Sequence, residues 1–203
     1  FTLNEDLNYS PLFDLLQRVQ LARPDYLLLI GPFVDIEHKE VNHGQMTESF
    51  EEKFLSVLSD VITQLAIVHT RVLLMPSTRD AHHDSVFPQP AFNIDLDVLP
   101  PAATSSLDKL ILLPNPTVFR LNDLVFAATS VDPLVSLGKT EILRSGMDGS
   151  EESKQARIER FASFLVRQHS FYPMFPPMEK DNVDYSHFDK LLLPVTPDVL
   201  ILP

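Results

Sequence analysis

Two polar stretches, each placed after an apolar run, contain the residue types that could carry chemistry in this chain. Asp80, His82 and His83 come shortly after an apolar run that ends at Met75, and Asp35 comes after a similar run. Carboxylates and imidazoles are common metal ligands, and a bound metal ion can activate water for hydrolysis. The two stretches therefore indicate a candidate metal site, and the residues around them decide whether metal can bind.

Short apolar runs predict the strands that position these stretches. Three runs are nearly continuous in Leu, Ile, Val or Met, a pattern typical of strands buried on both faces, and a fourth run is a further candidate. Helical patterns separate the runs, which favours an α/β fold with a right-handed strand–helix–strand crossover. The four ranges are Tyr26–Ile30, Arg71–Met75, Val199–Leu202 and, as the fourth, Leu110–Leu113.

Three helices are predicted from apolar stripes and capping signals. Ser10 is expected to be the N-cap of the first helix, because proline at position 11 suits the first helical turn. Ser49 and Glu52 have the spacing of a capping box at the start of the second helix. The predicted ranges are 11–22, about 49–67 and 153–169, with inward side chains that include Phe50 in the second helix and Ile158 in the third.

The remaining segments are predicted to be a hairpin, a short helix, proline-rich ordered loops and one mobile loop over residues 141–152. Two β-rich runs flank Asn122 and Asp123, which is typical of a tight hairpin. Asp132 and Pro133 are expected to open a short helix that ends near Gly138. The hairpin runs are 117–121 and 124–130, and the predicted loops are 87–104, 141–152 and the proline-rich segment 171–177.

Composition narrows the class of protein. The 203 residues are 44 % hydrophobic and 22 % charged, as in ordinary globular proteins, and include no run of about 18 apolar residues. Cysteine is absent, and the net charge of −12 disfavours direct contact with nucleic-acid phosphates. Because the chain starts at Phe1 and stops at Pro203 just after an apolar run, we expect sequence to be missing on both sides.

The two polar stretches resemble degenerate motifs of the calcineurin-like metallophosphoesterases. That family has Gly-Asp-x-x-Asp after one strand and Gly-Asn-His-Asp after a later one. Residues 31–35 and 77–80 lie at the matching places, but neither keeps the full motif. The resemblance implies that Pro32 replaces a bridging ligand, Thr78 a ligating Asn, and Arg79 the catalytic His. A permanent charge on Arg79 would also repel metal cations.

The polar side chains that remain at these loops have ordinary structural interpretations. Asp80 is expected to form an ion pair with Arg79 or to cap loop amides. His82 and His83 are expected to be loop or packing residues, because adjacent side chains of an extended chain point in opposite directions. His38 is expected to be solvated. The former active-site positions are thus Pro32, Asp35, Thr78, Arg79, Asp80, His82 and His83.

Four blocks make the chain resemble the B (regulatory) subunits of eukaryotic DNA polymerase α–primase. The Gly-Pro-Phe-x-Asp motif also fits the B subunits of the δ and ε polymerases. The Arg-Asp-x-His-His block with its Pro-Gln-Pro continuation and the Tyr-Pro-x-Phe-Pro-Pro block point to α. The blocks are 23–35, 76–83 with 86–90, 172–177 and 193–200.

This resemblance implies a non-catalytic scaffold subunit in the nucleus. Residues 1–203 would form one incomplete, inactive phosphoesterase-like domain, a layered α/β sandwich, with an OB-fold domain elsewhere. The implied partners are the zinc-binding C-terminal domain of the catalytic polymerase subunit and, within the complex, primase. DNA would be contacted only indirectly, and no metal, cofactor or membrane is implied. The subunit would support primer synthesis at the start of replication.

The sequence also allows two other functions and contains one candidate interface. One alternative is an active phosphoesterase whose rearranged site uses Asp35, Asp80, His82 and His83. Another is a DNA-binding module, which the charge disfavours. Tyr172 and Phe175 are interface candidates, because rigid proline-rich loops lose little entropy on binding, but these aromatics are equally compatible with core packing.

Overall fold

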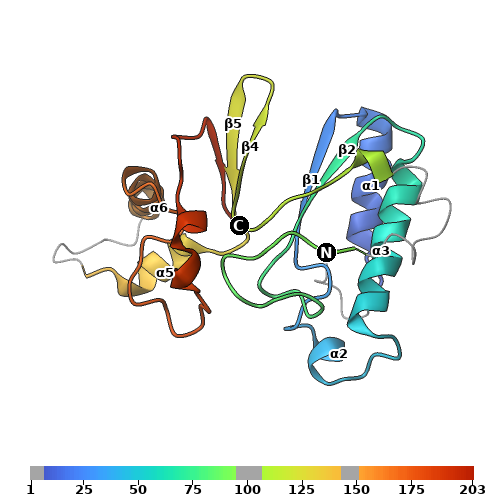
Figure 1. Ribbon diagram of the computed structural model, residues 1–203, viewed down its shortest axis with the longest axis horizontal. Coiled ribbons are helices and arrows are strands. Elements are labelled where there is room, and N and C mark those ends of the chain that lie inside the picture. The colour runs from blue at the N-terminus through green and yellow to red at the C-terminus, as the bar shows by residue number, and fades with distance from the viewer. Residues whose placement is uncertain (1–6, 95–106, 143–150) are drawn as a thin grey trace. The chain divides into compact units, whose positions relative to one another are not determined.

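The computed structural model describes residues 7–94, 107–142 and 151–203, which form two compact units (Figure 1). Unit 1 comprises residues up to Ser85 together with Gln89–Asn115, and unit 2 comprises Val86–Pro88 with Pro116–Pro203. Each unit has its own small sheet, so the α/β class predicted from the sequence is confirmed. A single domain over residues 1–203 stays a prediction. No helix in these ranges is both long enough and apolar enough to cross a membrane.

The sheet of unit 1 contains three parallel strands in the order β1-β2-β3. They are β1 (Tyr26–Ile30), β2 (Arg71–Met75) and β3 (Leu110–Leu112), at three of the predicted apolar runs. Four residues of the central strand β2 are buried, as expected for a strand covered on both faces. In β1, which pairs only with β2 in the described chain, Leu29 alone is fully buried.

Two long helices, α1 (Ser10–Ala22) and α3 (Phe50–Leu65), pack against each other in unit 1 (Figure 1). The Gln20 side chain donates from Nε2 to the Gln64 carbonyl at 2.7 Å and joins the two helices. The short helix α2 (Lys39–Asn42) and the 3-10 turn η2 (Leu107–Lys109) complete the unit. The Lys109 ammonium binds the Ala66 and Val68 carbonyls just past the end of α3, where a cation is favoured.

The starts of these helices confirm one capping prediction and correct another. Ser49 and Glu52 form both halves of the predicted capping box at α3. Ser10, however, is the first helical residue of α1, and the N-cap is Tyr9, which has φ 56° and no side-chain cap. Asn8 accepts from the Ser10 amide at 3.1 Å and thereby takes the capping role. Phe50 lies at the edge of the α3 stripe and is 37 % exposed, so its predicted burial is wrong.

Unit 2 is built on the predicted hairpin. Strands β4 (Thr117–Leu121) and β5 (Leu124–Ala128) pair antiparallel around Asn122, whose φ of 53° suits a tight turn. Strand β6 (Val199–Ile201) adds to β5 in parallel. The existence of the three strands and the pairing of the hairpin are confirmed. Strand β4 has its predicted bounds, whereas β5 and β6 end slightly earlier than predicted.

Three helical segments accompany this sheet. They are α5 (Pro133–Thr140), α6 (Glu151–Arg167) and the 3-10 segment η3 (Tyr185–Leu191). Asp132 caps α5 as predicted, through bonds from the Leu134 and Val135 amides. Helix α6 begins two residues before its predicted start, and Ile158 is 49 % exposed rather than inward. Residues 95–104 and 143–150 of the predicted loops lie outside the described residues.

Candidate functional site

The loops that follow β1 and β2 lie side by side and form one polar platform at the end of the sheet. Because β1 and β2 are parallel and in register, both chains leave the sheet at the same edge. Asp35 and Asp80 form an antiparallel bridge, with the Ile36 amide bonded to the Arg79 carbonyl at 2.9 Å and the Ala81 amide bonded to the Val34 carbonyl at 2.8 Å. All the sequence-predicted metal-site positions fall on or beside this platform.

The Asp80 carboxylate is a cap for backbone amides of both loops. Its Oδ1 accepts from the amides of Phe33 at 2.5 Å and Val34 at 3.2 Å, and its Oδ2 accepts from the Ser77 amide at 2.9 Å. The side chain is buried, so leaving these amides unpaired would be costly. Of the two interpretations of Asp80, the amide cap is therefore confirmed, and Arg79 is paired elsewhere.

Position 31, next to the Asp80 carboxylate, requires glycine. A Cβ atom at position 31 would lie 2.3 Å from Asp80 Oδ2 and 2.9 Å from the Ser77 amide nitrogen. Neither neighbour can move without breaking the bond between them. Because glycine has no Cβ, the Asp80 carboxylate can lie close to the backbone at position 31. This is a structural role.

Burial and hydrogen bonding act in opposite directions on the Asp80 carboxyl. Burial raises the pKa of Asp80 to about 6, while the amides of Ser77, Phe33 and Val34 and the nearby His83 lower it. The pKa remains below 7, so the group is an anion at neutral pH, which matches three donors pointing at it. A metal ion at this carboxylate would compete with the amide bonds from Phe33 and Val34 that join the two loops.

Arg79 forms an ion pair with Asp35 across the two loops. Its guanidinium contacts both oxygens of Asp35, at 3.1 Å from Nε to Oδ1 and through Nη2 to Oδ2, and also Glu37 at 3.0 Å. Asp35 Oδ1 additionally accepts from the Glu37 amide at 3.0 Å. Two N–H groups of the planar guanidinium match the two oxygens of a carboxylate, so the Asp35 carboxylate is oriented toward Arg79. This arrangement places a cation where a metal site would need an anion.

His82 packs as an aromatic ring. It stacks on Phe54 at 4.0 Å and on Phe92 at 5.3 Å between ring centroids, and both ring nitrogens are buried without a hydrogen-bond partner. Burial, followed by the charge of His83, lowers the pKa of His82 to about 4. A neutral imidazole flanked by phenylalanines agrees with the predicted packing role.

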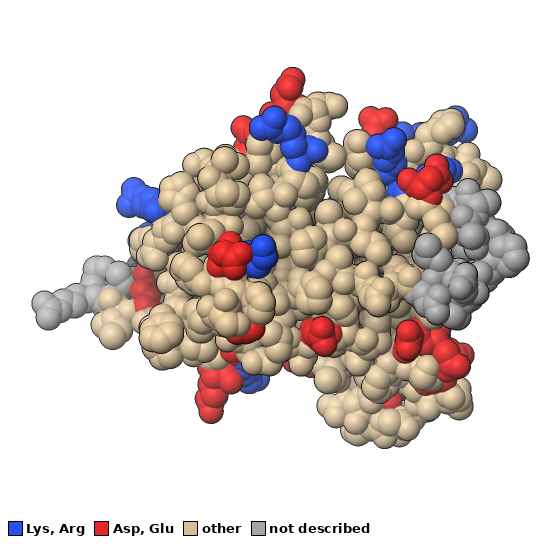
Figure 2. Space-filling view, viewed as in Figure 1, with Lys and Arg blue, Asp and Glu red and all other residues tan. Residues whose placement is uncertain are grey.

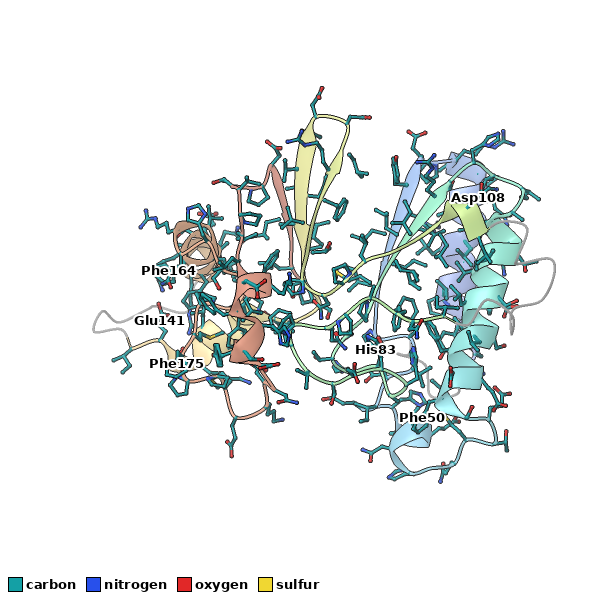
Figure 3. The ribbon with its side chains drawn as sticks, viewed as in Figure 1. Phe50, His83, Asp108, Glu141, Phe164 and Phe175 are labelled. Carbon is teal, nitrogen blue, oxygen red and sulfur yellow. The ribbon has the colours of Figure 1, made fainter. Side chains whose placement is uncertain are left out.

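The other histidines of this region also contact the chain itself. A ring nitrogen of His83, the residue labelled in Figure 3, lies 3.0 Å from the Pro90 carbonyl. His38 is buried, contrary to its predicted exposure. Its Nδ1 accepts from the Glu40 amide at 3.3 Å and caps α2. Within the described ranges, no three His, Asp or Glu side chains are grouped so that they could hold a metal ion.

Two further positions of the predicted former site, Pro32 and Thr78, lie in the same two loops. Pro32 has no side-chain donor and follows Gly31 through a cis peptide bond. Thr78 is half-buried in the turn that precedes Arg79. That these positions are the remnants of an active site stays a prediction.

Sequence reasoning missed Gln89 and Glu37 as parts of the platform. Gln89 is buried, and its Nε2 donates to the Ser77 carbonyl at 3.0 Å and to the Asp84 carbonyl, while its Oε1 accepts from Asn115 at 2.9 Å. The only signal for Gln89 was its place between two prolines. Glu37 had no signal beyond its nearness to Asp35.

The two interface candidates have different environments in unit 2. Tyr172 is 1 % exposed and packs in the core with Phe87 and Phe171, as the core-packing alternative predicts. Phe175, three residues further, is 84 % exposed. A role of either residue in binding a partner stays a prediction. Of the two, only Phe175 has an exposed side chain.

Together, the fold and the platform define an α/β protein in which strand-end loops are held to each other by their own polar side chains. Comparison with known families then places the chain. It belongs to the family of DNA polymerase alpha/epsilon B subunits, whose model matches residues 1–203. The family resemblance inferred from the four sequence blocks is thereby confirmed.

Individual relatives agree with this placement. The chain is 34 % identical over 204 residues to the DNA polymerase alpha B subunit of Bos taurus, 34 % over 210 residues to that of Drosophila melanogaster, and 33 % over 215 residues to that of Schizosaccharomyces pombe. Each alignment covers all of this chain but only 32 %, 30 % and 34 % of the respective relative. The chain thus spans about a third of the length of these curated relatives.

Proposed function

We propose that this chain is part of a non-catalytic B subunit of DNA polymerase α–primase. In this proposal it binds the C-terminal zinc-binding domain of the catalytic subunit and, within the complex, connects that subunit with primase to support primer synthesis. The names of the relatives support the polymerase α assignment. A nuclear location and indirect contact with DNA follow from the same assignment.

The observation that carries the non-catalytic part of the proposal is the use of Arg79, Asp35 and Asp80. The Arg79 guanidinium pairs with Asp35, and Asp80 caps the amides of Phe33, Val34 and Ser77. A phosphoesterase needs such carboxylates to hold metal ions that bind phosphate and activate water. Here the same carboxylates connect two loops, so they serve the rigidity of a scaffold.

The fold part of the proposal is an incomplete calcineurin-like sandwich over residues 1–203. Successive parallel strands β1 and β2, each followed by a polar loop at one sheet edge, support it. Unit 2 has a sheet of its own, accompanied by helices, which is the candidate for the rest of the sandwich.

Surface charge favours a protein partner over direct binding of DNA. The net charge is −12, and on the face shown in Figure 2 the described Lys and Arg side chains are scattered among acidic ones. Binding to DNA phosphates depends on several cations that together release counterions. A direct DNA-binding function therefore has little support.

Co-purification tests the proposal. The full-length protein that contains this chain is expected to form an equimolar complex with the catalytic polymerase subunit on size-exclusion chromatography. Deleting the C-terminal zinc-binding domain of the catalytic subunit should abolish the complex. Failure of the intact proteins to associate, or association that survives this deletion unchanged, would contradict the proposal.

A further inference from the structure

Three residues, Val86–Pro88, belong to unit 2 although the chain on both sides of them belongs to unit 1. The chain therefore enters unit 2 after Ser85, returns to unit 1 at Gln89 and enters unit 2 again after Asn115. We call residues Val86–Pro88 the strap. A segment that leaves one unit for only three residues needs a reason in the packing of the other unit.

The strap completes the core of unit 2 through Phe87. The Phe87 ring is buried in one hydrophobic cluster with Phe171 and Tyr172, and its centroid lies 6.2 Å from that of Tyr172. The Phe87 amide donates to the Asn182 carbonyl, and the Asp184 amide donates to the Phe87 carbonyl, both at 2.8 Å. Unit 2 thus takes part of its core and two backbone hydrogen bonds from a segment that the chain supplies before unit 1 is complete.

Gln89 fixes the end of the strap from within unit 1. Its backbone exchanges two hydrogen bonds with Asn115, of 2.6 and 3.0 Å. Its side-chain Nε2 donates to the Ser77 carbonyl at 3.0 Å and to the Asp84 carbonyl, and its Oε1 accepts from Asn115 at 2.9 Å. Gln89 and Asn115 are both buried, so loss of these bonds leaves polar groups unpaired at a cost in stability.

The same glutamine connects the strap to the polar platform. The Ser77 carbonyl accepts from Gln89, and the Ser77 amide donates to the Asp80 carboxylate at 2.9 Å. Only Pro88 separates Gln89 from Phe87, so Gln89 cannot shift far without displacing the strap. The platform, Gln89 and the strap thus form a continuous path of hydrogen bonds and covalent chain.

We propose that the strap couples the order of unit 2 to the platform of unit 1. Gln89 and Asn115 are the positioning residues, because they hold Phe87 where residues 182–184 and the core of unit 2 use it. Loosening this pair in unit 1 opens that part of unit 2. The inference goes beyond the proposed function and does not depend on it, because it concerns the protein without any partner.

Native-state hydrogen exchange of the full-length protein, read peptide by peptide in a mass spectrometer, tests the coupling. Gln89→Ala is expected to speed exchange of residues 182–193 in unit 2 at least about fivefold, although the side-chain bonds that it removes all lie in unit 1. Gln20→Ala is the matched control, because Gln20 Nε2 also donates to a carbonyl of unit 1, that of Gln64, at 2.7 Å. It should speed exchange in α1 and α3 only.

The result for unit 2 decides the outcome of this comparison. If Gln89→Ala speeds exchange around Asn115 but leaves residues 182–193 within twofold of the wild type, the coupling is overturned. The proposed function is untouched by that result, because no partner is present in the measurement.

Phe87→Ala supplies the reciprocal test, because a coupling free energy acts in both directions. The variant should speed exchange of residues 182–193 at least about tenfold, and it should also speed exchange of the peptides that contain Gln89 and Asn115. Strands β1 and β2 should stay within twofold of the wild type, because their helix-facing side chains pack in a different hydrophobic cluster. Unchanged exchange at Gln89 and Asn115 would overturn the coupling.

The wild-type protein supplies a third measurement, which holds even if a variant fails to fold. The amides of Gln89, Asn115 and Asp184 should open in one cooperative step as urea is raised, so that their free energies of opening converge. If Asp184 exchanges at low urea while Asn115 stays protected, unit 2 opens independently and the proposal is wrong.

Discussion

At the residue scale, side chains of the types that often bind metal ions instead bond to, or pack against, other groups of this chain. Asp80 accepts three backbone amides, and Arg79 joins Asp35 and Glu37 across the loops. His82 differs from them, because both of its ring nitrogens are buried without a partner. Its contribution is the packing of its ring between two phenylalanines, and it is held in the neutral form.

The stacked ring predicts a pH dependence of stability that depends on His82. The folded pKa of about 4 lies below the ordinary value of 6.5, so the folded state favours the neutral ring. Its contribution to stability is therefore complete above pH 6.5 and is lost as pH falls toward 4. His82→Phe, which keeps the stack, should remove this loss of about 1–2 kcal/mol, allowing for the partly exposed ring, in thermal unfolding from pH 7 to pH 4.5.

Comparison with the wild type isolates the effect of His82. Asp80, whose pKa is raised by burial, adds stability as pH falls, but it does so in both proteins. At pH 7 the variant should be at least as stable as the wild type, because it removes two unpaired nitrogens. Parallel pH profiles for the two proteins would show that His82 is not held neutral.

At the element scale, helix starts distinguish what local sequence encodes from what tertiary contacts impose. The α3 start was predictable, because the capping box is contained within Ser49–Glu52. The α1 start was not, because Tyr9 is placed by its hydroxyl, which donates to the Phe33 carbonyl 24 residues away at 2.7 Å. A serine before a proline is then only one of several possible caps.

Paired substitutions at the two serines test this difference. Ser49→Ala should lower the free energy of unfolding by about 1 kcal/mol, because the Glu52 amide loses its acceptor. Ser10→Ala should change it by less than about 0.5 kcal/mol, because Ser10 lies inside the first turn and is exposed. Urea unfolding of both variants measures the difference. An equal or larger loss for Ser10→Ala would restore Ser10 as the cap of α1.

The same distinction explains how much of the fold and site could be predicted. The strands and the hairpin at Asn122 were predictable from apolar runs and turn residues. The burial of Tyr172 and the exposure of Phe175 were not, since the proline-rich segment has no period that assigns a side chain to one face. The partners of Arg79 also depend on the pairing of two loops 44 residues apart.

At the scale of the whole molecule, family membership and the self-contained platform support one account. The chain belongs to a family of polymerase B subunits and spans about a third of its curated relatives. Its acidic charge and the exposed Phe175 fit a role in binding other proteins. Under the proposed function, the carboxylates at the sheet edge would maintain a rigid scaffold rather than hold metal ions.

The metal content of the purified full-length protein tests this account most directly, together with phosphodiesterase activity before and after Asp80→Ala. We predict less than stoichiometric manganese, iron or zinc attributable to this domain and no phosphodiesterase activity. Asp80→Ala should lower stability, by about 2–3 kcal/mol for the unpaired buried amides, without changing metal content. Stoichiometric metal that is lost on Asp80→Ala, with activity lost in parallel, would contradict the scaffold account and establish an enzyme with a rearranged site.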